Sequence, residues 1–152
     1  MSSPRAREGL LIIGYGNQLR GDDAAGQRAA GRLAKRGFDA IAVHQLTPEL
    51  AERVAAAREV IFIDASAEVA PGSIAVEPVY PGEAAPSVLE HHASPAGLLL
   101  LARDVYGATP AAKLISVGGE RFELGEPMSA RAKRGVAKAV AEVVRGAERG
   151  AG

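Results

Sequence analysis

The sequence predicts an α/β fold: a three-layer sandwich with a mainly parallel, twisted sheet of about five strands flanked by helices. Short apolar runs that end in turn residues alternate with longer segments in which small and apolar residues recur at helical spacing. Unbroken apolar runs are typical of strands buried on both faces, as the strands of parallel sheets are. Strands that alternate with helices indicate βαβ units, and these place helices on both faces of the sheet.

The first half of the chain supplies three predicted strands and two predicted helices. Residues 10–13 are consecutively apolar and stop at a glycine, which predicts the first strand. Small and apolar residues at helical spacing predict a helix over 23–35, with a glycine after it where a C-cap belongs. Residues 40–44 are the second strand. A threonine, a proline and a glutamate begin a helix over 47–57, and the apolar run 60–63 is the third strand.

The second half gives weaker patterns. Residues 73–80 alternate only in part and predict a fourth strand. Ser94, followed by a proline, can cap a helix that runs through 98–105. Residues 113–117 are the fifth strand, and the last helix follows Ser129, with its apolar residues on one face.

Composition limits the class of protein. With 152 residues, 47% of them hydrophobic, we expect a single domain over 1–152, with 1–8 and 147–152 as flexible tails. The 18 basic residues balance the 18 acidic ones, which argues against nucleic acid or a membrane surface as partner. No apolar run approaches the roughly 20 residues that span a bilayer. We therefore expect a soluble, cytoplasmic protein, and we separately expect it to be a monomer.

Several polar residues follow predicted strands at the edge where open α/β sheets bind ligands. Asp22 and Asp23 follow the first strand, His44 ends the second and Asp64 follows the third, while His92 precedes a helix. Since the chain has no cysteine, any metal chemistry falls to Asp, Glu and His. Two carboxylates and one imidazole suit a divalent transition ion with open positions. Without a cation, two close carboxylates repel each other, which favours capture of a cation or a proton.

Better-known motifs are absent. The glycine loop after the first strand has Leu19 at the third glycine position of the dinucleotide fingerprint, and two aspartates stand where a pyrophosphate would bind. The chain has no Gly-Lys-Ser/Thr phosphate loop, no Gly-x-Ser-x-Gly elbow and no His-Glu-x-x-His helix. Nucleotide binding, a serine triad and a zincin site are therefore disfavoured.

Structural roles for the same residues stay open. Either Asp22 or Asp23 can cap the first helix, since aspartate is among the best N-cap residues. Asp64 can form an Asx-turn after its strand. His91 and His92 can be ordinary loop histidines. Each of these roles is reasonable alone, but together they leave unexplained why the residues share one edge of the sheet.

The segment Gly14–Gly26 resembles the opening signature of the [NiFe]-hydrogenase maturation proteases, G-x-G-N-x-L-x-x-D-[DE]-x-x-G. Further stretches are similar to parts of that family: an apolar strand closing on Asp-Ala at 61–65, a histidine before a helix at 92–95, and the last loop and helix start at 118–129. The likeness extends from about Leu11 to Val144. A departure is the segment 44–50, which replaces a glycine-rich stretch common in other members.

The resemblance implies an endopeptidase that removes the C-terminal extension of a hydrogenase large-subunit precursor after nickel insertion. Asp23, Asp64 and His92 would contact the nickel of this precursor, so no tightly bound cofactor of the protein's own is expected. Asn17 would orient the loop beneath Asp23. His91 is a rival to His92, which we prefer for its distance to Pro95. Two other functions stay open: a self-contained metal-dependent hydrolase of small amides or peptides, and a non-catalytic module that checks nickel loading.

Overall fold

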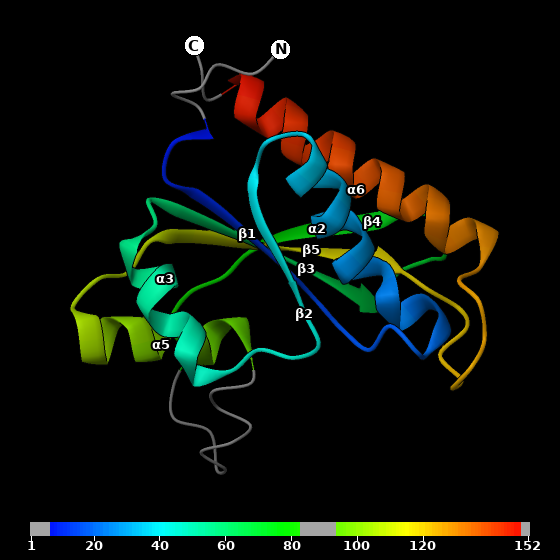
Figure 1. The fold of residues 1–152 in the computed structure, drawn as a ribbon, viewed down its shortest axis with the longest axis horizontal. Helices are drawn as coiled ribbons and strands as arrows, with labels where there is room; N and C mark the ends of the chain where they lie inside the picture. The colour runs from blue at the N-terminus through cyan, green and yellow to red at the C-terminus, as the bar shows by residue number, and fades with distance from the viewer. Residues whose placement is uncertain (1–6, 83–93, 150–152) are drawn as a thin grey trace.

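The computed structural model describes residues 7–82 and 94–149, and these form a five-stranded sheet with helices on both faces (Figure 1). The predicted α/β sandwich is confirmed. The strand order is β2-β1-β3-β5-β4. The strands are β1 (Leu10–Tyr15), β2 (Asp39–Val43), β3 (Glu59–Ser66), β4 (Ile74–Pro78) and β5 (Ala111–Gly118). None of the helices in the described residues has the length and apolar character that crossing a membrane requires.

The sheet is parallel except at one edge. β1 pairs in parallel with β2 and with β3, and β3 pairs in parallel with β5. β4 is antiparallel to β5 and is shorter than the 73–80 strand that we predicted. β4 is antiparallel because the connection over residues 67–73 is short, whereas a parallel strand would need a crossover of a dozen or more residues.

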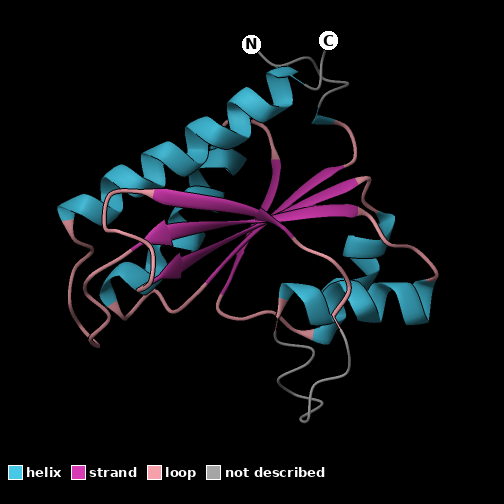
Figure 2. Ribbon diagram, turned by 180° about the vertical axis from the view of Figure 1, so that it is seen from behind, coloured by secondary structure: helices cyan, strands magenta, loops and turns pink. Residues whose placement is uncertain are grey.

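Alternate side chains of the central strands serve the two halves of the core. Leu10 and Ile12 of β1 point to one face, which α2 (Ala25–Lys35) and α6 (Ala130–Arg149) cover. Leu11 and Ile13 point to the other face, which α3 (Ala51–Ala56) and α5 (Pro95–Tyr106) cover. All four side chains are at most 4% exposed, so the apolar run is a strand buried on both faces, as predicted. Figure 2 shows the sheet between its two helical layers.

Two of the predicted helices begin with a short 3₁₀ turn where we predicted regular helix. The helix expected from Asp23 consists of η1 (Gly21–Ala24) followed by α2, and the helix expected from Thr47 consists of η2 (Pro48–Leu50) followed by α3. For α5 the predicted cap is present, since Ser94 Oγ accepts a hydrogen bond from Gly97 N at 3.0 Å.

Part of each predicted tail belongs to the folded domain. The guanidinium of Arg7 lies 3.8 Å from the centre of the Phe38 ring, and its Nη1 donates to the carbonyl of Arg36. At the other end α6 continues to Arg149, and Ala147 is 5% exposed within the core. The expectation of a tail is therefore wrong for residues 7–8 and 147–149. The rest of the two predicted tails lies outside the described residues.

The strand order places a switch point between β1 and β3. The chain passes from β1 to β2 on one side and then returns to β3 on the other side of β1. In open α/β sheets ligands bind outside the carboxyl ends of the strands at such a point. β1 leads into Asp22 and Asp23 there, and Asp64 stands near the carboxyl end of β3.

Candidate functional site

Asp64 lies in β3, at the carboxyl edge of the sheet and beside the end of β1. Gly14 pairs with Ile63, so Asp64 is level with Tyr15, the last residue of β1. The strand continues to Ser66, and Asp64 itself pairs with Ser116 of β5. The alternative of an Asx-turn after the strand is therefore wrong. The side chain is half-buried, and its Oδ1 accepts a hydrogen bond from Ala65 N at 2.8 Å.

Asp23 is held in η1 by the loop that leaves β1. Asn17 N donates to Asp23 Oδ2 at 2.7 Å, and Asn17 Oδ1 in turn accepts from Leu19 N at 2.8 Å. Gly16 has a φ of +140°, and a Cβ there would lie 2.1 Å from the carbonyl oxygen of Asp23. Only glycine fits this contact. The glycine and asparagine of the sequence motif thus shape the loop around the half-buried Asp23.

Asp23 and Asp64 are close enough to affect each other electrostatically. Burial raises the pKa of Asp64 from its ordinary value of 3.8 to about 6, and the negative charge of Asp23 adds to this rise. The hydrogen bonds from Ala65 N and from the Tyr15 hydroxyl oppose it. Two half-buried carboxylates that repel each other favour a cation or a proton between them. Their chemistry therefore fits the oxygen-rich part of the predicted metal contact.

Tyr15 is a member of the site that our sequence analysis missed. Burial raises the pKa of its hydroxyl, and the charge of Asp64 and their shared hydrogen bond raise it further. The phenol therefore stays protonated and donates to the Asp64 carboxylate. Its position at the end of an apolar run was readable from the sequence. Its contact with Asp64 depends on the pairing of β1 with β3, which no local pattern specifies.

Replacing Tyr15 by Phe is expected to raise the pKa of Asp64 above about 6, because the variant loses a hydrogen bond that stabilises the ionised carboxylate. If the site needs an ionised Asp64, the acid limb of the pH–rate profile moves to higher pH while the rate at pH 8 changes little. Rates measured from pH 5 to pH 8 test this prediction. An acid limb at the wild-type pH in the variant would contradict it.

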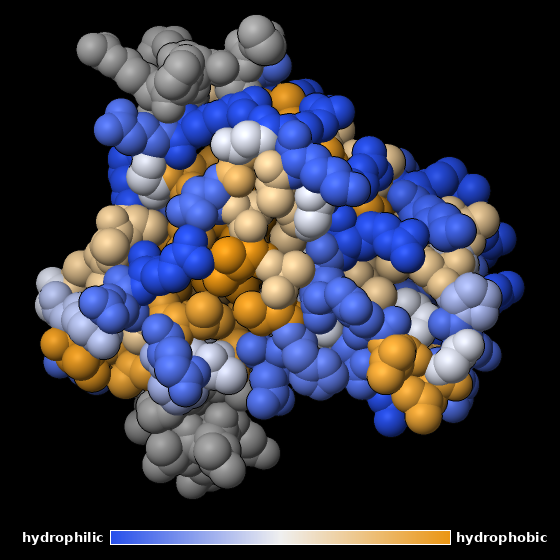
Figure 3. All heavy atoms as spheres, viewed as in Figure 1, coloured by the Kyte–Doolittle hydropathy of each residue, from blue (hydrophilic) through white to orange (hydrophobic). Residues whose placement is uncertain are grey.

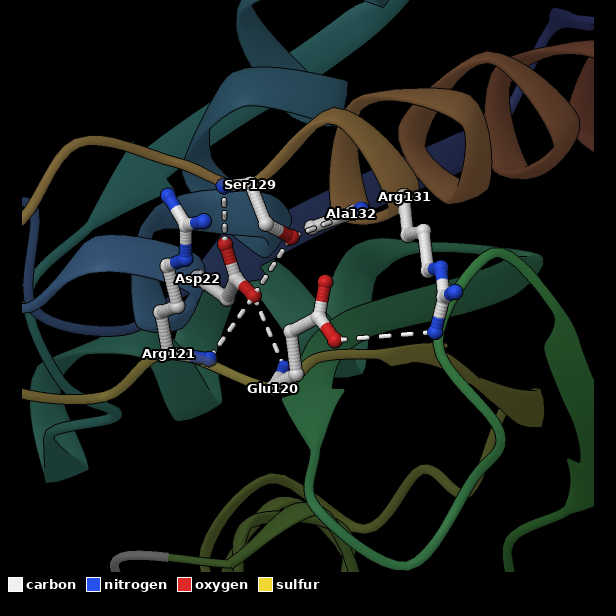
Figure 4. Close-up of polar contacts among 6 residues, drawn as sticks. All are labelled: Asp22, Glu120, Arg121, Ser129, Arg131 and Ala132. Atoms are coloured by element: carbon white, nitrogen blue, oxygen red, sulfur yellow. Dashed lines mark hydrogen bonds and ion pairs between the residues drawn. The ribbon is translucent and has the colours of Figure 1, made fainter.

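Asp22 has a different role from its neighbour. Its side chain is completely buried, and Figure 4 shows it pointing into the loop after β5. Asp22 Oδ2 accepts from Glu120 N at 2.8 Å, Arg121 N at 3.0 Å and Ser129 Oγ at 2.9 Å, while Oδ1 accepts from Ser129 N at 2.7 Å. Burial alone would raise the pKa of Asp22, but these hydrogen bonds outweigh it and lower the pKa.

Neither aspartate caps the first helix with its side chain, so that alternative is wrong. Asp22 instead fixes the start of the last helix, at the far end of the chain. Ser129 Oγ, which donates to Asp22, accepts from Ala132 N at 3.1 Å in the first turn of α6. The pair Asp22-Asp23 therefore divides into one buried structural carboxylate and one that faces the site.

The predicted histidine contact is not tested by the described residues, because His91 and His92 lie outside them. His44 lies just after β2 and is exposed. Within residues 7–82 and 94–149, no three His, Asp or Glu side chains gather closely enough to hold a metal ion. His92 as third contact stays a prediction, and Asp23 and Asp64 are the two predicted residues that the fold brings together.

Comparison with known proteins gives matches at the level of structure. No protein-family model matches the chain, and no curated protein sequence does. Matching solved structures include the [NiFe] hydrogenase maturation protease HybD from Thermococcus kodakarensis, with 24% identity and a TM-score of 0.69 over 90% of this chain and 97% of that one.

Two further solved structures match over a similar span. The [NiFe] hydrogenase maturation protease HycI from Thermococcus kodakarensis is 21% identical, with a TM-score of 0.69 over 91% of each chain. The hydrogenase maturating endopeptidase HybD from E. coli is 22% identical, with a TM-score of 0.67 over 90% of each chain. The chain therefore has the fold of the hydrogenase maturation proteases.

Proposed function

We propose that this protein is a [NiFe]-hydrogenase maturation protease. It removes the C-terminal extension of a hydrogenase large-subunit precursor after nickel has been inserted. The observation that carries the proposal is the convergence of Asp23 and Asp64 at the switch point between β1 and β3, where burial raises the pKa of Asp64 and the charge of Asp23 adds to the rise. The shared fold and the motif over Gly14–Gly26 support the same reading.

The nickel belongs to the substrate in this proposal. Asp23, Asp64 and His92 contact it, and a cation between the two carboxylates relieves their mutual repulsion. This contact positions the scissile peptide bond at the carboxyl edge of the sheet, and holding a reacting bond in place is a large part of catalysis. Tyr15 contributes by donating a hydrogen bond to Asp64, which favours the ionised carboxylate that a metal contact needs.

Mass spectrometry of a nickel-loaded large-subunit precursor, before and after incubation with this protein, tests the proposal. We expect the precursor to lose the mass of a C-terminal peptide, and we expect nickel-free precursor to stay intact. Complex formation without a change in mass would indicate the non-catalytic checkpoint module instead. A stoichiometric metal ion in protein purified without chelator would indicate the self-contained metallohydrolase.

A further inference from the structure

We propose that Leu19 and Leu124 form a docking patch for the folded body of the polypeptide substrate. The substrate body would carry an apolar depression near the tail that is removed. The inference rests on the proposed function, since it concerns how the same site selects its substrate. The two leucines are 67% and 63% exposed, and no other leucine in the described part of the chain is exposed. Figure 3 shows an apolar cluster at lower right, over the loops that follow β1 and β5.

The two loops are joined by backbone hydrogen bonds although they lie far apart in the sequence. Gly125 N donates to the carbonyl of Leu19 at 2.7 Å, and Asp22 N donates to the carbonyl of Arg121 at 2.6 Å. Gly21, with a φ of +54°, approaches so closely that a Cβ would lie 2.4 Å from the carbonyl oxygen of Arg121. A patch on pinned loops loses little conformational entropy when a partner binds, which favours affinity.

The exposure of these leucines points to a binding surface because the two loops that carry them are hydrogen-bonded to each other. Single exposed apolar residues are common on protein surfaces and need no explanation. Here two loops from different parts of the chain are held together by backbone hydrogen bonds, and each presents a leucine at the contact. The backbone hydrogen bond between Gly125 and Leu19 holds the two loops together, and both leucine side chains are exposed to water. An apolar surface on loops that are already held in place needs little reordering when a partner covers it.

The position of the patch favours the substrate as its partner. Leu19 belongs to the loop in which Asn17 N holds Asp23, and the Leu124 loop is held by Asp22. The patch therefore lies on the same carboxyl edge as Asp23 and Asp64. A body docked on Leu19 and Leu124 would be aligned with the two carboxylates, which fixes where its tail meets them.

Other occupants fit less well. Two leucines supply far less than the roughly 800 Å² per partner of a stable interface, so any occupant must also cover the neighbouring rim. A second copy of this chain seated there would cover Asp23 and Asp64, which the proposed function needs open. An extended peptide binds in a groove or along a sheet edge, whereas these two side chains project from the surface. A depression on a folded protein suits them better.

Kinetics of the variants Leu19→Ser and Leu124→Ser on nickel-loaded precursor test the proposal. We expect each substitution to raise KM about ten-fold and to leave kcat within about two-fold, because docking is lost while the catalytic carboxylates stay in place. The thermal midpoint should stay at its wild-type value. Val105→Ser is the matched control. Val105 is 61% exposed and lies near the end of α5. The end of α5 leads into the start of β5, so Val105 lies at the edge of the sheet opposite to the carboxyl edge that carries the patch.

The outcomes separate this inference from the proposed function. If wild-type protein leaves the precursor intact, both fail. If wild-type protein cleaves it and both Leu19→Ser and Leu124→Ser keep the wild-type KM, the docking patch is overturned and the protease assignment stands. A lowered kcat at unchanged KM would also overturn it, since the leucines would then only position the Asp23 loop. An equal rise of KM in Val105→Ser would show a general loss of surface apolarity and would overturn it too.

Discussion

Replacing Asp64 by Asn should lower processing of the nickel-loaded precursor by about a thousand-fold while making the protein more stable at pH 8. The loss of activity follows from the proposed role, because an amide is a poor ligand for a cation that a carboxylate would hold. The gain in stability follows from the raised pKa of Asp64, since the folded protein at pH 8 keeps an ionised carboxylate in a site that disfavours it. Cleavage assays and urea unfolding followed by circular dichroism measure the two effects.

The pH dependence of this stability gain has a definite sign. Asp64 titrates at about 6 in the folded protein and near its ordinary 3.8 when unfolded. Below pH 3.8 the side chain is neutral in both states, so wild type and variant should be equally stable. As the pH rises from about 3.8 to about 6, the Asp64 carboxyl makes the wild type lose stability relative to the variant, and above about 6 the difference should level off at roughly 1–3 kcal/mol in favour of the variant.

Asp23→Asn is the matched variant for this prediction. It should lose processing as well, and it should lower the pKa of Asp64, because the negative charge that helps to raise that pKa is gone. Wild-type cleavage rates in either variant would remove that aspartate from the mechanism. An Asp64→Asn protein less stable than wild type at pH 8 would contradict the electrostatic account, whatever its activity.

Replacing Asp22 by Ala is expected to cost about 3–5 kcal/mol in the free energy of unfolding at pH 7. Asp22 is completely buried and accepts hydrogen bonds from Glu120 N, Arg121 N, Ser129 N and the Ser129 hydroxyl. Alanine leaves these donors in the protein interior without an acceptor. The N-terminus of α6 and the loop after β5 should both loosen. Urea unfolding followed by far-ultraviolet circular dichroism measures the change, and the chain has no tryptophan for fluorescence.

Asp39→Ala is the control for this effect. Asp39 forms an ion pair with Arg53 at 2.8 Å, but both side chains are largely exposed, at 62% and 46%. Exposed ion pairs contribute about 0–1 kcal/mol, so this variant should unfold close to the wild type. If Asp22→Ala were no less stable than Asp39→Ala, the buried hydrogen bonds of Asp22 would not hold the last loop as we argue.

The sequence predicted the elements of the sheet well because their signals are local. An apolar run such as residues 10–13 has no stable alternative to burial on both faces, and a proline at the start of a helix has the required φ already. The edge strand β4 was harder to predict. Its residues are mostly exposed, so their alternation is weak, and its length and direction depend on the connection from β3 and on pairing with β5.

For the candidate site too, local sequence signals determined one part and contacts between distant segments determined the other. The motif Gly14–Gly26 by itself determined that a shaped loop carries two aspartates to the carboxyl edge, because glycines and Asn17 act on their immediate neighbours. Only the tertiary structure decided that Asp22 is a buried structural carboxylate and that Asp23 faces the site. Asp22 meets Ser129, 107 residues along the chain, and Asp64 meets Tyr15 through the pairing of β1 with β3. Contacts between distant segments set burial and charge, and these separate a structural carboxylate from one that faces a site.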